Sequence, residues 1–310
     1  MQATTLRIGT RGSPLALAQA HEVQDRIAKA HGLSHDAITI TVIKTTGDQI
    51  LDRPLADIGG KGLFTKEIED ALLANDIDVA VHSMKDMQTA LPDGLTIGAV
   101  LPREDVRDAF ISLTHKSLAD LPAGTVVGTS SLRRQAQLLH KRPDLQVVGF
   151  RGNVQTRLRK LQEGVAEATF LAVAGLKRLG LQDRITAPVP IDQMLPAVAQ
   201  GAIALEIRAG DEATSHMIAP LNDASTALAV TVERAFLAKL EGSCRTPIAG
   251  YAQLESGKLL FRGQILSPDG KKGYDVARSG SPESALNLGL DAADDVLSKA
   301  DASILVRSSA

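Results

Sequence analysis

Short runs of β-branched residues alternate with helical patterns over roughly the first two thirds of the chain, and this alternation constrains the fold more than any other feature. Strands are expected at residues 6–9, 38–43, 79–82, 125–128, 146–149 and 169–172. Helices are expected between them at residues 14–30, 65–74, 132–141 and 154–163. Ser13 followed by Pro14 is a strong helix start, because serine caps a helix and proline suits its first position. The pattern predicts helices layered on open sheets.

The two halves of this α/β region resemble each other. Residues 6–11 and residues 125–130 each read as a strand that ends in polar residues before a helix. A second matching pair follows at residues 78–83 and 168–173. We therefore expect two similar open α/β domains around a cleft, with ligand groups at the carboxyl ends of the strands.

The rest of the chain indicates where it passes from one domain to the next, and it predicts a smaller third domain. Proline-containing segments near residues 101–102 and 187–190 mark the crossings. Residues 251–276 read as a hairpin or meander with a turn at 267–270, and a helix is expected at 282–300. The predicted domains are residues 1–101 with 200–219, residues 105–195, and a small α/β domain at residues 222–310.

Composition disfavours two classes of partner. The 310 residues include 34 basic and 36 acidic side chains, and only 6 Phe, 2 Tyr and no Trp. A nucleic-acid binder is expected to be basic and to offer aromatic stacking platforms, so we expect no nucleic-acid partner. The longest apolar stretch, residues 168–176, is too short to span a bilayer. With no apolar leader at the N-terminus and one cysteine, the sequence predicts a cytoplasmic protein without a membrane partner.

Cys244 is the only cysteine of the chain, within Glu-Gly-Ser-Cys-Arg-Thr-Pro-Ile at residues 241–248. A single cysteine forms no intramolecular disulfide and no zinc site by itself. It is therefore a buried thiol, a nucleophile or a point of covalent attachment. The neighbouring glycine, arginine and proline indicate a turn with a cation that favours the thiolate.

Arginines recur where predicted strands give way to helices. Arg11 precedes one helix, Arg133 and Arg134 lie at the start of another, and Arg151 and Arg157 frame a third helix start. A cation, hydroxyl donors and a helix N-terminus together hold carboxylate or phosphate. The sequence therefore predicts a polyanionic ligand, without separating these two chemistries.

Asp86 lies beside Lys85 in the segment 82–86 that ends a predicted strand. Its carboxylate suits general acid–base catalysis or the stabilisation of a cation. The alternative is that Asp86 and Lys85 only form a surface ion pair. Residues 59–62, Gly-Gly-Lys-Gly, lack the spacing of a nucleotide phosphate loop and favour a mobile lid. No metal site is expected.

Taken together, eight segments resemble the porphobilinogen deaminase (hydroxymethylbilane synthase) family in the family's order. These segments are residues 11–17, 59–64, 81–86, 128–134, 151–157, 171–178, 200–202 and 241–244. The resemblance spans nearly the whole chain. It implies a monomer of three domains, of which the first two resemble a periplasmic-binding-protein pair and the third carries Cys244.

The resemblance also implies the reaction. Four porphobilinogen molecules are joined head to tail with loss of four ammonia molecules, and water releases hydroxymethylbilane for tetrapyrrole biosynthesis. The primer is a dipyrromethane cofactor joined to Cys244 by a thioether. Asp86 matches the family's catalytic carboxylate, which stabilises positive charge where it develops. Each pyrrole carries an acetate and a propionate, which accounts for the arginines.

Further site residues follow from the same resemblance. The implied cofactor contacts, besides Cys244, are Asp48, Lys61, Ser83, Lys85, Thr129, Ser131, Arg133, Arg134 and Arg157. The implied substrate contacts are Arg11, Ser13, Phe64, Arg151, Arg178 and Gln200. Asp57 stands where some relatives have a cofactor-contacting lysine, which removes one cation from the expected site.

Two other functions account for part of this pattern. A cytoplasmic, non-catalytic protein that binds an anionic solute in the same cleft accounts for the arginines but not for Cys244 and Asp86. A phosphate-using transferase is disfavoured because the phosphate loop is missing.

Overall fold

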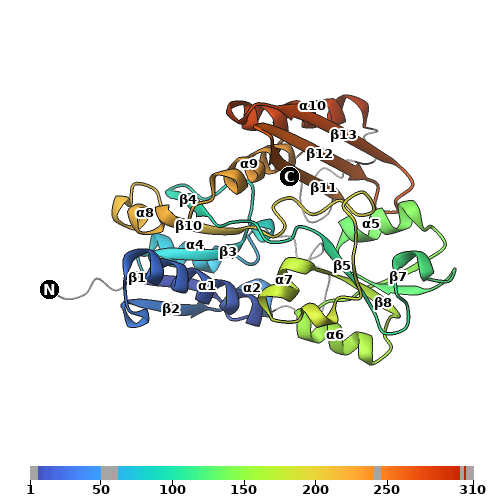
Figure 1. Ribbon diagram of the computed structural model, residues 1–310, viewed down its shortest axis with the longest axis horizontal. Helices are drawn as coiled ribbons and strands as arrows, with labels where there is room; N and C mark the ends of the chain where they lie inside the picture. Colours follow the sequence, from blue (N-terminus) through green and yellow to red (C-terminus); the bar gives the residue numbers. More distant parts are fainter. Residues whose placement is uncertain (1–5, 50–61, 241–245, 301–303, 305–310) are drawn as a thin grey trace. The chain divides into compact units, whose positions relative to one another are not determined.

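The computed structural model describes residues 6–49, 62–240, 246–300 and 304 (Figure 1). These residues form two compact units. The first consists of residues 6–49, 62–104 and 201–227, and the second of the described residues in 105–200 and 228–304. No helix in these ranges is both long enough and apolar enough to cross a membrane.

The first unit is built on a five-stranded sheet in the order β2-β1-β3-β10-β4. Its strands are β1 (Leu6–Arg11), β2 (Ile38–Ile43), β3 (Val79–Ser83), β4 (Leu95–Val100) and β10 (Ile203–Arg208). The strands β1, β2 and β3 are parallel, whereas β10 runs antiparallel to both of its neighbours. The carboxyl ends of β1 and β3 therefore lie at one edge of the sheet.

Helices cover both faces of this sheet. They are α1 (Pro14–His31), α4 (Lys66–Leu73) and α8 (Glu212–Ile218), with the short α2 (Thr46–Gln49) beside them (Figure 1). The helix α1 packs with α8 over an apolar core that includes Val23 and Val81. On the other face, Ile68 and Leu72 of α4 pack against the sheet. Ser13 caps α1, because its Oγ accepts a hydrogen bond from the backbone N–H of Ala16 at 3.2 Å.

The second unit contains a five-stranded sheet in the order β7-β6-β8-β5-β9. Its strands are β5 (Asp108–Ser112), β6 (Val126–Gly128), β7 (Gln146–Val148), β8 (Ala168–Ala172) and β9 (Ala187–Pro188). As in the first unit, three parallel strands (β7, β6 and β8) lie beside a strand, β5, that runs antiparallel to both of its neighbours. The order therefore repeats that of the first unit, as the resemblance between the two halves of the sequence predicts.

Three helices accompany this sheet: α5 (Leu132–Lys141), α6 (Val154–Gln162) and α7 (Val173–Arg178). On one face Leu138 of α5 packs with Phe110 and Phe170. On the other face Leu161 of α6 and Leu176 of α7 share a core. Each helix follows a parallel strand, so all three helix N-termini lie near the carboxyl edge of the sheet.

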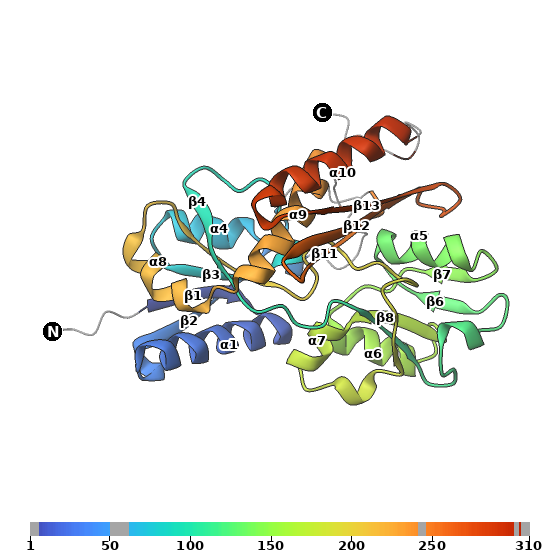
Figure 2. The same ribbon diagram turned by 45° about the horizontal axis from the view of Figure 1, so that its top comes forward.

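A smaller antiparallel sheet in the second unit has the order β11-β12-β13. Its strands are β11 (Ile248–Glu255), β12 (Lys258–Leu266) and β13 (Gly273–Gly280). The helix α10 (Ala285–Lys299) packs along β12 and β13 (Figure 2). Residues of α9 (Ala224–Lys239) contribute to the same core, where Phe236 meets Phe261 edge-on at 5.0 Å between ring centroids.

The predicted fold class is confirmed: there are two open α/β sheets and a smaller sheet with helices. All six predicted parallel strands exist, and the tail is a meander as expected. The strands β4, β5, β9 and β10 were not predicted from the sequence. The boundaries of the three predicted domains stay a prediction.

Candidate functional site

A pocket opens in the first unit at the carboxyl ends of β1 and β3. Arg11 ends β1, Ser13 caps α1, and Ser83 ends β3. The residues that line the pocket are Arg11, Ser13, Leu15, Ala16, Gln19, Phe64, Thr65, Val81, His82, Ser83 and Asp86. Five of the residues predicted from the sequence are thus brought together from segments far apart in the chain.

Arg11 and Asp48 form an ion pair at one side of this pocket. The Arg11 Nε donates to Asp48 Oδ2 at 3.1 Å, and its guanidinium also contacts Asp48 Oδ1. The same guanidinium lies 4.1 Å from the centre of the Phe64 ring, in a cation–π contact. Burial raises the pKa of Asp48, but the hydrogen bonds from Arg11 and Thr45 outweigh it and hold that pKa below its usual range. Both carboxylate oxygens are therefore engaged by residues of the protein.

Ser83 is held by a residue that the sequence analysis did not single out. The side-chain amide of Gln19 and the Ser83 hydroxyl are hydrogen-bonded, with the Gln19 Nε2 at 2.9 Å from the Ser83 Oγ. Gln19 is buried on α1 among Ala16, Ala20 and other apolar residues. A glutamine on the apolar stripe of a predicted helix is a signal that was present in the sequence, because a buried amide needs a partner.

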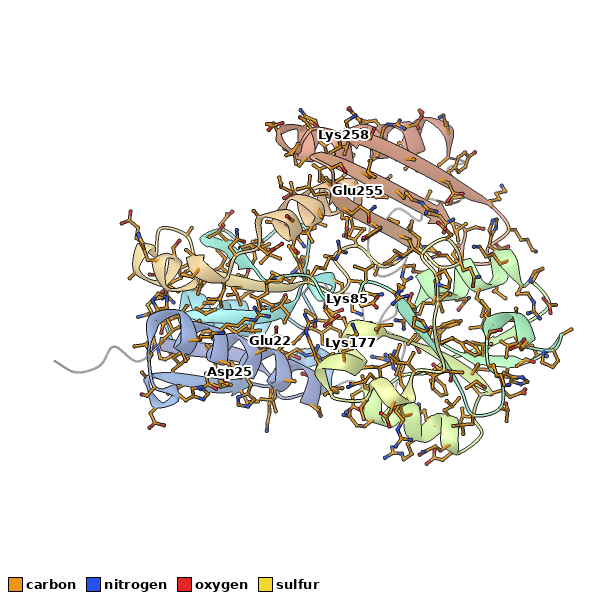
Figure 3. All side chains as sticks on the ribbon, viewed as in Figure 1. Glu22, Asp25, Lys85, Lys177, Glu255 and Lys258 are labelled. Atoms are coloured by element: carbon orange, nitrogen blue, oxygen red, sulfur yellow. The ribbon has the colours of Figure 1, made fainter. Side chains whose placement is uncertain are left out.

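Asp86 ends the short helix η2 (Met84–Asp86) that follows β3. This turn is anchored by the buried Met84, whose N–H donates to Ala202 O at 3.0 Å. The Asp86 side chain is exposed, and no described residue forms a hydrogen bond or ion pair with it. Lys85, also exposed, lies on the same turn (Figure 3). The Asp86 carboxylate is thus free to act on a ligand in the pocket.

A buried ionisable cluster lies on the α4 face of the sheet, and its two glutamates were not identified from the sequence. His82 Nε2 is 2.9 Å from Glu206 Oε2, and both side chains are almost inaccessible to solvent. Glu69 of α4 is also buried. Burial raises the pKa of Glu69, the Thr65 hydroxyl opposes this shift, and the nearby Glu206 adds to it. His82 also lines the pocket, whereas Glu69 and Glu206 do not.

In the second unit, the predicted residues lie at the carboxyl edge of the sheet. Thr129 follows β6, and its Oγ1 accepts from the N–H of Ser131 at 3.2 Å. Ser131 in turn caps α5. The backbone N–H groups at the start of α5 and the two hydroxyls make this turn suitable for an anion.

Arg133 and Arg134, in the first turn of α5, share one buried carboxylate. Arg134 donates from Nε to Asp108 Oδ1 at 3.1 Å and from Nη2 at 2.7 Å. Arg133 Nη2 forms an ion pair with Asp108 Oδ2 at 2.8 Å. Gln200 Nε2 donates to Asp108 Oδ1 at 3.1 Å. Three residues predicted to contact ligand therefore converge on Asp108, which the sequence analysis did not identify.

Two further arginines lie at the turn between β7 and α6. Arg157 Nε donates to Gly152 O at 2.8 Å, and Lys160 Nζ donates to Arg151 O at 3.1 Å. Asn153 caps α6 through its Oδ1, which accepts from the N–H of Thr156. Arg178 ends α7, beyond the carboxyl end of β8. Three helix starts thus border this edge, and Arg133, Arg134, Arg151, Arg157 and Arg178 are all partly or fully buried. The predicted contacts Cys244 and Lys61, together with Asp57, lie outside the described residues.

Comparisons with known proteins agree on one family. The family model described as porphobilinogen deaminase, dipyromethane cofactor binding domain, matches residues 6–216, and the model of the family's C-terminal domain matches residues 227–298. Porphobilinogen deaminase of Paracoccus denitrificans is 59% identical over 297 residues, which is 96% of this chain and 95% of that protein. The chloroplastic porphobilinogen deaminase of Pisum sativum is 58% identical over 95% of this chain and 82% of its own.

Among solved structures, the methionine-binding protein MetQ is similar with a TM-score of 0.46 and 14% identity, over 71% of this chain and 90% of that chain. A periplasmic substrate-binding protein of an ABC transporter from Coxiella burnetii is similar with a TM-score of 0.43 and 14% identity, over 70% of this chain and 92% of that chain.

Proposed function

The chain belongs to the porphobilinogen deaminase family, and from this membership we infer that it joins four porphobilinogen molecules head to tail into hydroxymethylbilane. It is a transferase that forms carbon–carbon bonds and releases ammonia. The match over nearly the whole chain favours this enzyme over a non-catalytic protein that binds an anionic solute.

The described residues fit a dipyrromethane cofactor, which bears several carboxylates and two pyrrole N–H groups. Arg133 is 7% exposed, and its Nε has no hydrogen-bond partner among the described residues, so a buried donor remains for an acceptor on a ligand. The carboxylate of Asp86, unpaired within the described part of the chain, suits N–H donors. When bound, the cofactor supplies the pyrrole carbon to which the first porphobilinogen is joined.

The observation that carries the proposal is the free carboxylate of Asp86 at the carboxyl end of β3. Loss of ammonia from porphobilinogen leaves a positively charged carbon electrophile, and a fixed carboxylate stabilises that charge as it develops. Asp86 is the catalytic residue in this account. Its oxygens accept hydrogen bonds from pyrrole N–H groups and help move the proton that the attacked ring loses.

The remaining site residues serve binding in the same proposal. Cations and hydroxyls hold the acetate and propionate groups, because charge-assisted hydrogen bonds to carboxylates are strong and directional. Cys244 carries the cofactor through a thioether. The cofactor contacts are Lys61, Ser83, Lys85, Asp48, Thr129, Ser131, Arg133, Arg134 and Arg157. The substrate contacts are Arg11, Ser13, Phe64, Arg151, Arg178 and Gln200.

Oligomeric state and location belong to the proposal as well. We propose a monomer, which the family resemblance implies, and light scattering on the purified protein measures its mass directly. A cytoplasmic location is in keeping with a chain that has a single cysteine, because cytosolic proteins keep their thiols reduced.

Intact-mass measurement tests the function. The purified protein should weigh more than its sequence by one dipyrromethane, and porphobilinogen should add a ladder of single pyrrole units to that mass. An unmodified mass that stays unmodified after incubation with hydroxymethylbilane, and that forms no ladder, would refute the proposal.

Cys244→Ser is the matching variant for the attachment point. It removes the only thiol of the chain and keeps a side chain of similar size. We expect this variant to carry no dipyrromethane after incubation with hydroxymethylbilane, and to give no colour with Ehrlich's reagent. A normal pyrrole colour in the variant would place the attachment elsewhere.

A further inference from the structure

Asp108 occupies a special position in the sheet of the second unit. It begins β5, which runs antiparallel to β8, and it lies opposite Ala172 at the carboxyl end of β8. The antiparallel strand β5 thus places the Asp108 carboxylate at the edge of the sheet where the parallel strands end and the helices begin. The Asp108 side chain is fully buried.

Asp108 fixes the orientation of three side chains at once. Its Oδ1 accepts two hydrogen bonds from Arg134 and one from Gln200, and its Oδ2 faces the guanidinium of Arg133. Backbone carbonyls hold the outer nitrogens: Arg134 Nη1 donates to Phe170 O at 2.8 Å and Arg133 Nη1 donates to Leu195 O at 2.7 Å. Long side chains held this way have lost their rotamer freedom before any ligand arrives.

The charges around Asp108 do not balance. Arg133 and Arg134 are 7% and 4% exposed, and each carries a positive charge, whereas Asp108 is the one acidic partner they have in the described part of the chain. One positive charge therefore remains in a buried place, which is unfavourable until an anion joins it. Burial lowers the pKa of Arg133, Asp108 opposes this shift, and the neighbouring Arg134 adds to it.

We propose that Asp108 is a positioning residue for the carboxylate-binding site: it neutralises one of the two guanidiniums, aligns both together with Gln200, and leaves one positive charge for a ligand carboxylate. This inference rests on the proposed function, because the ligand is the cofactor that this family carries. Asp108 itself touches no ligand. Its carboxylate acts through Arg133, whose Nε is the buried donor still without a partner among the described residues.

The test compares cofactor loading in Asp108→Asn and in a matched control. Asp78 is the control, because it also shares its carboxylate between two arginines: its Oδ1 lies 2.7 Å from Arg7 and 3.3 Å from Arg208. It precedes β3, at the end of the strand away from Asp86. Apoprotein of each variant is incubated with hydroxymethylbilane, and the fraction that gains the dipyrromethane mass is followed over time beside the melting temperature.

We expect Asp108→Asn to load the cofactor more slowly than wild type by about tenfold or more, since a small misplacement of oriented groups has a large effect. Asp78→Asn should lower the melting temperature and load at the wild-type rate. Loading of Asp108→Asn at the wild-type rate would overturn the inference. So would an equal slowing in Asp78→Asn, because loading would then follow stability rather than alignment.

Asp108→Glu keeps the charge and moves the carboxylate by one methylene, so it provides the test if Asp108→Asn does not fold. Its loading should still be slower than that of wild type, and full wild-type loading would contradict alignment by Asp108. Wild-type protein that never gains the dipyrromethane would refute the proposed function itself. Wild-type loading together with normal loading of both Asp108 variants would refute the present inference alone.

Discussion

Asp86 differs from Asp48, the other acidic residue beside the pocket of the first unit, in having no partner among the described residues. We expect Asp86→Asn to lower steady-state turnover by about 10²-fold or more, because the amide keeps the shape of the side chain but neither stabilises positive charge nor accepts a proton. Turnover is measured by colour with Ehrlich's reagent, on protein whose intact mass shows that the cofactor is present.

Asp93→Asn is the control for Asp86. Asp93 is also exposed and lies in the turn before β4, outside the pocket lining. This variant should turn over like wild type. Near-wild-type turnover of Asp86→Asn would show that the carboxylate of Asp86 is not central to the reaction.

The individual residues of the site were predictable to the extent that their roles are local. Arg11, Ser13 and Ser131 stand at strand-to-helix turns, and a local pattern of this kind is visible in a sequence. The partners that fix them were not predictable, because they come from distant segments. Asp108 precedes the arginines it holds by 25 or more residues and lies in a strand that was not recognised.

At the scale of elements, the turn between β12 and β13 packs against α5. His140 Nδ1 donates to Gly270 O at 2.7 Å, and Gln135 Nε2 donates to Pro268 O at 3.4 Å. Gly270 has a φ of +72°, and a Cβ there would lie 2.5 Å from Ala136 O and 2.6 Å from the backbone nitrogen of His140. The contact thus joins the meander to the helix that carries Arg133 and Arg134, and it requires glycine at this position.

Gly270→Ala should lower the free energy of unfolding by about 2–4 kcal/mol, because left-handed strain and a backbone clash add together. Gly257→Ala is the control. Gly257 has a φ of +75° in the turn between Glu255 and Lys258, which are both labelled in Figure 3, and a Cβ there would meet open space. Gly257→Ala adds the left-handed strain without a clash, so it should lower the free energy of unfolding by about 1–2 kcal/mol. Urea unfolding of both variants measures the difference, and equal losses would mean that the contact with α5 is not tight.

Some of the helices and strands could be predicted from the sequence and others could not. Parallel strands flanked by helices produce a clear alternation of β-branched runs and helical patterns in the sequence. The strand β2 was predicted with its observed bounds. The strands β4 and β5 have no α-helix directly after them, so the alternation did not mark them, whereas β10 is followed by α8 and was missed nonetheless. Each of them pairs antiparallel with a strand distant in sequence, and only the folded sheet makes that pairing visible.

At the scale of the whole molecule, two sheets of the same strand order carry different chemistry. The sheet of the first unit presents the carboxylate of Asp86, which has no partner among the described residues. The sheet of the second unit presents buried and partly buried arginines at the corresponding edge. A common fold therefore supplies helix N-termini at both edges, and in the proposed function the side chains placed there serve charge stabilisation in the first unit and carboxylate binding in the second.

This division predicts how the mass ladder responds to Arg151→Ala. Each added pyrrole brings two more carboxylates, so a cation that binds the growing chain matters more at later additions than at cofactor attachment. We expect attachment at the wild-type rate and later additions slowed by about tenfold, because a charged hydrogen-bond partner is lost. Arg159→Ala is the control, on the helix α6 that follows Arg151, since Arg159 is exposed and pairs only loosely with Glu163 at 3.6 Å. Single-turnover intact-mass spectra at timed intervals measure every species. An unchanged ladder in Arg151→Ala, or an equal slowing of attachment and elongation, would contradict a role for Arg151 in holding the growing chain.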